Sequence, residues 1–288
     1  MLGTYGLPVA VETDPEWQSE LLDLDAYLAR IGFTGPRTPG ADTLHRVLRG
    51  HMDAIAFENI DIALGRPVSL DLDRIQDKLV RAGRGGYCYE NNLLLAAALD
   101  RLGFPVTRLL ARIRQGESRR RFRTHTVLLV RADDEVWLAD AGYGYSGLME
   151  ALPLRDGAVS SVADWTWRLA ADGPDWVVRI PGDGTDGGWF DMYSFRQEPQ
   201  FRIDFEAAHY VSSTRPGSPF VGGLVAQKET EKERRLLRDT SLEIRYADGR
   251  VERRELSAAD TVCALGELFS IALNDEDERA LLHFFAAK

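Results

Sequence analysis

Cys88 is the residue of this chain best placed to act as a nucleophile. It follows Gly85 and Gly86 and stands just before a run of Leu and Ala residues that ends at Gly103. Leu and Ala favour helices, whereas glycine costs about 1 kcal/mol in a helix interior and is typical of tight turns. The spacing therefore predicts that Cys88 lies at the start of a buried helix. Unpaired backbone N–H groups at a helix start lower the pKa of a thiol and favour the reactive thiolate.

A nucleophilic cysteine needs a base, and the base needs a group that orients it. His125 lies in one β-prone run, and Asp140 ends the next such run. Asp133 and Asp134 between the runs are typical of a tight turn, so we expect adjacent strands of one hairpin. Adjacent strands bring His125 and Asp140 together. With Cys88 they form a Cys-His-Asp constellation suited to nucleophilic catalysis.

The sequence around these residues resembles the signature blocks of the arylamine N-acetyltransferases. The matching blocks are Arg84-Gly-Gly-Tyr-Cys-Tyr-Glu-Asn-Asn92, Arg123-Thr-His-Thr126 and Asp140-Ala-Gly-Tyr-Gly144. Further blocks agree at 51–61, 65–68 and 212–220, so the resemblance spans most of the chain. Taken alone, a buried cysteine, a hydrogen-bonded histidine or a turn aspartate is commoner than a catalytic one. Their joint occurrence within these blocks favours catalysis.

The chain departs from the family pattern at a few positions. Ala56 stands where the family usually has proline, Tyr89 where it usually has phenylalanine, and Arg215 where it usually has histidine. None of these belongs to the Cys-His-Asp constellation. Arg215 is the departure that we expect to alter the cleft for the cofactor or the acceptor.

The resemblance implies a two-step acetyl transfer. Cys88 would take the acetyl group from acetyl-CoA as a thioester, and an arylamine or hydrazine nitrogen would then receive it. His125 would remove the amine proton, and Asp140 would orient the imidazole, with a thiolate–imidazolium pair in the resting enzyme. Two alternatives remain open. An ansamycin-type amide synthase would take a polyketide chain from an acyl carrier protein, and a thiol hydrolase would use the same constellation with water.

Other residues are candidates for substrate binding or for support of the site. Arg119, Arg120 and Arg121 form a basic run suited to the phosphates of CoA, although a solvated loop explains it equally well. We expect Arg84 to pair with Glu58 and support the turn before the cysteine, the alternative being a solvated Glu58. The remaining candidates, whose aromatic members would fit a protein core equally well, are Tyr87, Tyr89, Thr124, Gly142, Tyr143 and Gly144.

The expected fold class is α+β with three domains. Apolar residues at helical spacing fill 1–103, whereas short β-prone runs separated by Asp-Gly and other glycine-rich turns fill 104–209. Such runs predict an antiparallel β-barrel or sandwich. Residues 210–288 mix both patterns and are expected to form a smaller α/β lid. The resemblance implies the same helical bundle, barrel and lid, with a cysteine-protease-like core in the cleft between bundle and barrel.

Composition argues against several other classes. The net charge of −10 disfavours nucleic acid as a partner, because phosphate backbones are bound by many Lys and Arg residues. No apolar run approaches the ~20 residues of a membrane helix, and no signal-peptide pattern opens the sequence, so we expect a cytoplasmic protein. Cys88 and Cys263 are the only cysteines and should stay reduced. Without paired Cys or His spacing, no metal is expected.

Overall fold

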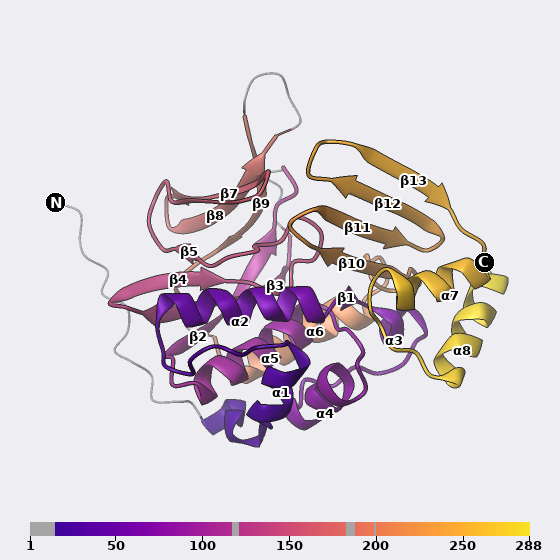
Figure 1. Ribbon diagram of the computed structural model, residues 1–288, viewed down its shortest axis with the longest axis horizontal. Helices are drawn as coiled ribbons and strands as arrows, with labels where there is room; N and C mark the ends of the chain where they lie inside the picture. Colours follow the sequence, from indigo (N-terminus) through magenta and orange to yellow (C-terminus); the bar gives the residue numbers. More distant parts are fainter. Residues whose placement is uncertain (1–14, 117–120, 183–187, 199) are drawn as a thin grey trace.

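The structure is a computed structural model that describes residues 15–116, 121–182, 188–198 and 200–288. Helices dominate before residue 104, strands dominate the middle, and the last part combines both (Figure 1). The helices are α1 (Leu24–Arg30), α2 (Ala41–Ala54), α3 (Ile60–Ala63), α4 (Leu72–Gln76), α5 (Cys88–Arg101), α6 (Arg202–Thr214), α7 (Ala258–Glu267) and α8 (Asp275–Ala286), with 3₁₀ turns at Pro15–Trp17 and Ser19–Leu21 and a π-helical turn at Asp77–Arg81. The strands are β1 (Phe57–Glu58), β2 (Val106–Ile113), β3 (Arg123–Ala132), β4 (Glu135–Ala139), β5 (Leu152–Pro153), β6 (Val159–Val162), β7 (Trp165–Asp172), β8 (Asp175–Pro181), β9 (Trp189–Phe195), β10 (Val225–Glu229), β11 (Glu233–Arg238), β12 (Ser241–Tyr246) and β13 (Val251–Glu255).

The central helix of the first region is α5. It begins at Cys88, and every residue from there to Leu99 is buried. The helix gives way at Gly103, whose φ of 87° is a left-handed conformation that glycine adopts without strain. The prediction of a buried helix that starts at the cysteine and stops at this glycine is confirmed. The helix thereby anchors Cys88 in the largest hydrophobic cluster of the described chain.

The middle region forms an eight-stranded antiparallel sheet that curls into a nearly closed barrel. Its strand order is β5-β4-β3-β2-β9-β8-β7-β6. Two of the β-prone runs of the sequence, at 106–113 and 189–195, coincide with β2 and β9 in full. The short strands β5 and β6 were not predicted, because so few residues show no clear alternation. Of the two predicted architectures, the barrel is the observed one.

The predicted hairpin is formed by β3 and β4. The strands pair antiparallel from Leu128 opposite Ala139 to Ala132 opposite Glu135. The two aspartates of the turn have φ values of 49° and 63°, as a two-residue type I′ turn requires. Because β4 ends at residue 139, Asp140 follows directly at the strand end.

The last region is built on a second antiparallel sheet with the order β1-β10-β11-β12-β13. Its first strand comes from residues 57–58, far back in the chain, and α7 and α8 contribute to the same hydrophobic cluster. In Figure 1 this sheet stands beside the barrel, with α7 and α8 at its outer end. The domain limits after 103 and 209 stay a prediction, since β1 joins the last region and α6 runs through residue 209.

Within the described ranges, no helix has both the length and the apolar character needed to cross a membrane.

Candidate active site

The turn before Cys88 is built from glycines because other segments lie directly against it. A Cβ on Gly85 would lie 2.4 Å from the carbonyl oxygen of Ala56, and one on Gly86 would lie 2.8 Å from a side-chain carbon of α5. The Gly86 N–H donates to the Ala56 carbonyl at 3.2 Å, and the Glu58 N–H donates to the Gly86 carbonyl at 3.0 Å. These contacts place Cys88 at the first position of the helix.

The expected ion pair between Arg84 and Glu58 is present beneath this turn. Arg84 Nη2 lies 2.8 Å from Glu58 Oε1, and the two side chains are 8% and 0% exposed. Arg84 Nη1 also contacts Asp277 of α8 at 3.0 Å. Burial lowers the pKa of Arg84, but the neighbouring carboxylates outweigh it and raise the pKa overall. Arg84 therefore connects the turn to Glu58 of β1 and to Asp277 of α8, and neither the Arg84 nor the Glu58 charge is left unpaired.

Cys88 is almost completely covered, since only 3% of the residue is exposed. Its Sγ lies 3.7 Å from the carbonyl oxygen of Thr124, to which the thiol donates. Burial raises the pKa of Cys88 and the charge of Asp140 raises it further, whereas backbone N–H groups at the helix start lower it. The predicted net lowering is wrong for this conformation, because loss of solvent outweighs the helix start. The covered site favours the thiol over the expected thiolate.

His125 and Asp140 form a buried hydrogen bond. His125 Nε2 lies 2.7 Å from Asp140 Oδ2, and the side chains are 3% and 0% exposed. Burial raises the pKa of Asp140, but His125, Asn92 and the Gly142 N–H together outweigh it and lower the pKa overall. A carboxylate only accepts hydrogen bonds, so Nε2 carries a proton and donates it to Asp140. The other ring nitrogen, Nδ1, is the one left to exchange a proton with a reacting group.

Asn92 completes the site, and sequence reasoning gave it no role. Its Nδ2 donates to Asp140 Oδ1 at 3.0 Å and to the Thr126 carbonyl at 2.7 Å. Its Oδ1 accepts from the Ala141 N–H at 2.9 Å. The side chain therefore connects α5 to both strands of the hairpin. The spacing of four residues after Cys88, which places both on one helix face, was the available signal.

The candidate tyrosines occupy different places. Tyr87 and Tyr89 are fully buried between α5 and α6, where the Tyr87 hydroxyl bonds to His209 Nδ1 and the two rings pack together. Tyr143 is partly exposed, and its ring meets the ring of His125 edge-on with 5.5 Å between centroids. Of the three, Tyr143 is the one that combines exposure with contact to His125.

The candidate glycines are closely packed against protein. A Cβ on Gly142 would lie 2.7 Å from the Cα of Cys88, and one on Gly144 would lie 1.7 Å from Gln227 Oε1. Both therefore shape the loop after Asp140. Thr124, by contrast, is partly exposed at the start of β3.

A groove of about 480 Å³ opens between α6 and the strands β2 and β3, and Cys88, His125 and Asp140 are not among its lining residues. Its volume lies in the range of small-molecule sites. Arg123 on its wall pairs with Glu198 at 2.8 Å, and Arg215 packs over the exposed ring of Phe122 with 5.0 Å to the centroid. Its lining residues are Leu110, Phe122, Arg123, Glu198, Gln200, Asp204, Ala207, Ala208 and Val211.

The basic run near this groove is only partly described. Arg121 Nη1 donates to Gln115 Oε1 at 2.9 Å. Arg119 and Arg120 lie outside the described residues.

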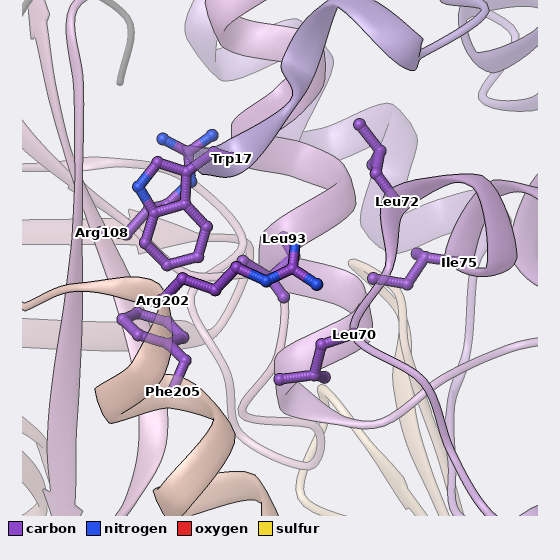
Figure 2. A pocket seen from close by; sticks show the side chains of 8 residues that line it. All are labelled: Trp17, Leu70, Leu72, Ile75, Leu93, Arg108, Arg202 and Phe205. Atoms are coloured by element: carbon purple, nitrogen blue, oxygen red, sulfur yellow. The ribbon is translucent and has the colours of Figure 1, made fainter. Parts of the chain in front are cut away.

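A second pocket lies between α4, α5 and α6 and is shown in Figure 2. Its space of about 10 Å³ is roughly what one water molecule needs. Leucine, isoleucine and aromatic side chains together with Arg108 and Arg202 line it, and Cys88, His125 and Asp140 do not. This pocket is a packing gap in the core. Across the described ranges, no cluster of three or more His, Cys, Asp or Glu side chains is arranged to hold a metal ion.

Comparison with known proteins agrees with this geometry. Residues 41–278 match a family described as N-acetyltransferase. The arylamine N-acetyltransferase of Mycolicibacterium smegmatis is 37% identical over 260 residues, which cover 88% of this chain and 94% of that protein. The crystal structure of the Nocardia farcinica arylamine N-acetyltransferase matches with a TM-score of 0.86 at 41% identity, covering 94% of this chain and 98% of that one.

A structure of the Mycobacterium marinum arylamine N-acetyltransferase in complex with CoA also matches, with a TM-score of 0.84 at 33% identity over 91% of this chain and 98% of that one. These likenesses extend over nearly the whole chain, including all the segments that build the site. The chain therefore belongs to the arylamine N-acetyltransferase family.

Proposed function

We propose that this protein transfers an acetyl group from acetyl-CoA, through a thioester on Cys88, to the nitrogen of an arylamine or hydrazine. The observation that carries the proposal is the buried His125–Asp140 hydrogen bond of 2.7 Å beside the helix start that bears Cys88. Membership of the family and the CoA complex of the Mycobacterium marinum relative support acetyl-CoA as the donor.

In the first step, the Cys88 sulfur attacks the carbonyl carbon of acetyl-CoA while its proton passes to His125 Nδ1. The tetrahedral intermediate then collapses, and the CoA sulfur leaves with that proton as a free thiol. Asp140 stabilises the transient imidazolium through the Nε2–H bond. Because burial raises the pKa of Cys88, His125 acts in this proposal as the base that takes the thiol proton during attack.

In the second step, the amine nitrogen attacks the carbonyl carbon of the acetyl-enzyme. His125 takes one amine proton as the N–C bond forms, and the Cys88 sulfur leaves and is reprotonated. Backbone N–H groups at the start of α5 stabilise the oxyanion in both steps. The cycle restores the starting protonation of Cys88 and His125.

Substrates approach, in this proposal, through the groove between α6 and the strands β2 and β3. Its wall includes Arg123, and the carbonyl of the next residue, Thr124, contacts Cys88 Sγ. Tyr143 lines the acceptor end because its partly exposed ring lies against His125. Arg119, Arg120 and Arg121 meet the phosphates of CoA. Both cysteines are free, which supports a reducing compartment such as the cytoplasm.

The test is a steady-state assay with acetyl-CoA and an aniline, using Cys88→Ser and a matched Cys263→Ser control. Cys263 is an exposed free thiol, so the same chemical change there should leave activity intact. We expect activity to be lost in Cys88→Ser alone. Equal activity in both variants would refute the proposal.

The same assay separates the alternatives, neither of which has support among the relatives. An amide synthase would be indifferent to acetyl-CoA but would accept a longer acyl chain from a carrier protein. A thiol hydrolase would release acetate at a rate that does not depend on the amine.

A further inference from the structure

The loop 141–147 follows Asp140 and carries Tyr143 to the ring of His125. Its first residues are fixed within the site. The Ala141 N–H donates to the side chain of Asn92 at 2.9 Å, and the Gly142 N–H donates to Asp140 at 2.8 Å. Tyr143 comes after these anchors, so its position also depends on what holds the far end of the loop.

The far end of the loop is held by strand β10 of the C-terminal sheet. The Tyr145 N–H donates to Gln227 Oε1 at 2.9 Å, and the Gly147 N–H donates to Glu229 Oε1 at 3.0 Å. Gln227 and Glu229 are two residues apart in the strand, so their side chains lie on the same face. Gly144 lies so close to Gln227 that a Cβ would sit 1.7 Å from the amide oxygen. The loop therefore packs directly against the side chain of Gln227.

The same strand is connected, through β1, to the turn before Cys88. Gln227 lies opposite Phe57 in the register of β10 and β1, and Phe57 forms a β-bridge with Gly86. The neighbouring Glu58 N–H donates to the Gly86 carbonyl at 3.0 Å. Gln227 thus belongs to a strand that is fixed relative to Cys88, while its side chain holds the loop of Tyr143.

We propose that Gln227 is a positioning residue that holds Tyr143 against His125 and thereby supports the step in which the amine accepts the acetyl group. The proposal rests on the proposed function, because it assigns Tyr143 to the acceptor end of the site. The side-chain oxygen of Gln227 suits this place, since it accepts the Tyr145 N–H at 2.9 Å.

Loss of this hydrogen bond should affect the two half-reactions unequally. Asp140 keeps its hydrogen bonds with Asn92 and His125, and Cys88 keeps its place in α5, so acetylation by acetyl-CoA should stay within about twofold of wild type. Tyr143 loses its far anchor, so discharge by an aromatic amine should slow by roughly five- to tenfold through a higher KM, the scale of one hydrogen bond.

The experiment compares Gln227→Leu, which removes the acceptor at similar size, with Gln227→Glu, which keeps an oxygen at the same reach. Lys228→Leu is the matched control, because Lys228 is the next residue of the strand and bonds instead to Ser270 at 2.7 Å. If the leucine variant does not fold, Gln227→Asn replaces it, because its oxygen lies one methylene too far back. Rates of acetylation and of discharge by an aniline and by hydrazine are measured for each variant.

We expect Gln227→Leu to slow discharge by the aniline by that factor, while discharge by hydrazine and acetylation keep their wild-type rates. Gln227→Glu should restore discharge by the aniline. A purely structural role would lower both half-reactions together and would not distinguish the aromatic acceptor. Equal behaviour of Gln227→Leu and Lys228→Leu, or no rescue by glutamate, would overturn the inference. Failure of the wild type to become acetylated would instead refute the proposed function.

Discussion

Replacing Asp140 with Asn should disable His125 as a base while leaving the site assembled. Asp140 Oδ1 accepts from Asn92 Nδ2 at 3.0 Å and from the Gly142 N–H at 2.8 Å. These two donors would hold the amide oxygen of the new side chain, so its NH₂ group would face His125. An NH₂ group donates to Nε2 and forces the ring proton onto Nδ1. The nitrogen that must receive the thiol proton is then occupied.

The magnitude follows from the buried pair. In the wild type the carboxylate faces an imidazolium during the reaction, at 2.7 Å and with both side chains at most 3% exposed. Leaving one buried charge without its partner costs about 3–5 kcal/mol. At about 1.4 kcal/mol for each factor of ten, acetylation should slow by roughly 100- to 5,000-fold.

The assay is single-turnover formation of the acetyl-enzyme, followed by quenched-flow mass measurement. Asp134→Asn is the matched control, because it makes the same change in an exposed turn of the same hairpin, at a φ of 63° that asparagine tolerates. We expect the control to react like wild type. An Asp140→Asn variant within tenfold of the control would refute the reasoning about the tautomer.

Three further predictions follow from the buried groups. Because burial raises the pKa of Cys88, alkylation of the Cys263→Ser protein by iodoacetamide should still be increasing at pH 9, and a plateau near pH 7 would contradict this. Burial lowers the pKa of His51 from 6.5 to about 4. The contribution of His51 to the free energy of unfolding is therefore present above pH 6.5 and is lost as the pH falls through 4. His51→Gln should therefore remove about 3 kcal/mol of acid-induced destabilisation, measured by urea unfolding between pH 4 and 7. Arg84→Met should lower the free energy of unfolding by about 3–5 kcal/mol, whereas the same change at the exposed Arg81 should cost under about 1 kcal/mol; equal losses would show that burial is not the cause.

The parts of the site that could be predicted from the sequence rest on local signals. The glycines before Cys88 and the Leu and Ala run after it indicate a turn and a helix without knowledge of the rest of the fold. The β-prone runs around Asp133 and Asp134 likewise predict a hairpin, and the hairpin alone brings His125 to Asp140. The Arg84–Glu58 pair could be expected because a charge among apolar neighbours needs a partner.

The parts that could not be predicted depend on segments that are distant in the sequence. Asn92 reaches Asp140 only because α5 packs against the hairpin, and Gln227 reaches the loop only because its strand pairs with the two residues of β1. The prediction of a lowered pKa for Cys88 failed for the same reason. A helix start is visible in the sequence, whereas the burial that outweighs it is produced by the whole fold.

The covered position of Cys88 also has a consequence for access. A residue that is 3% exposed can be reached by acetyl-CoA only after neighbouring side chains move.

The most direct measurement of the central claim is the intact mass of the protein after brief mixing with acetyl-CoA alone. We predict one added acetyl group in wild type and in Cys263→Ser, located on Cys88 by peptide mapping, and none in Cys88→Ser. On addition of an aniline, the acetyl group should leave much faster than in buffer. Full activity without an acetylated Cys88, or discharge by water as fast as by the amine, would contradict the account.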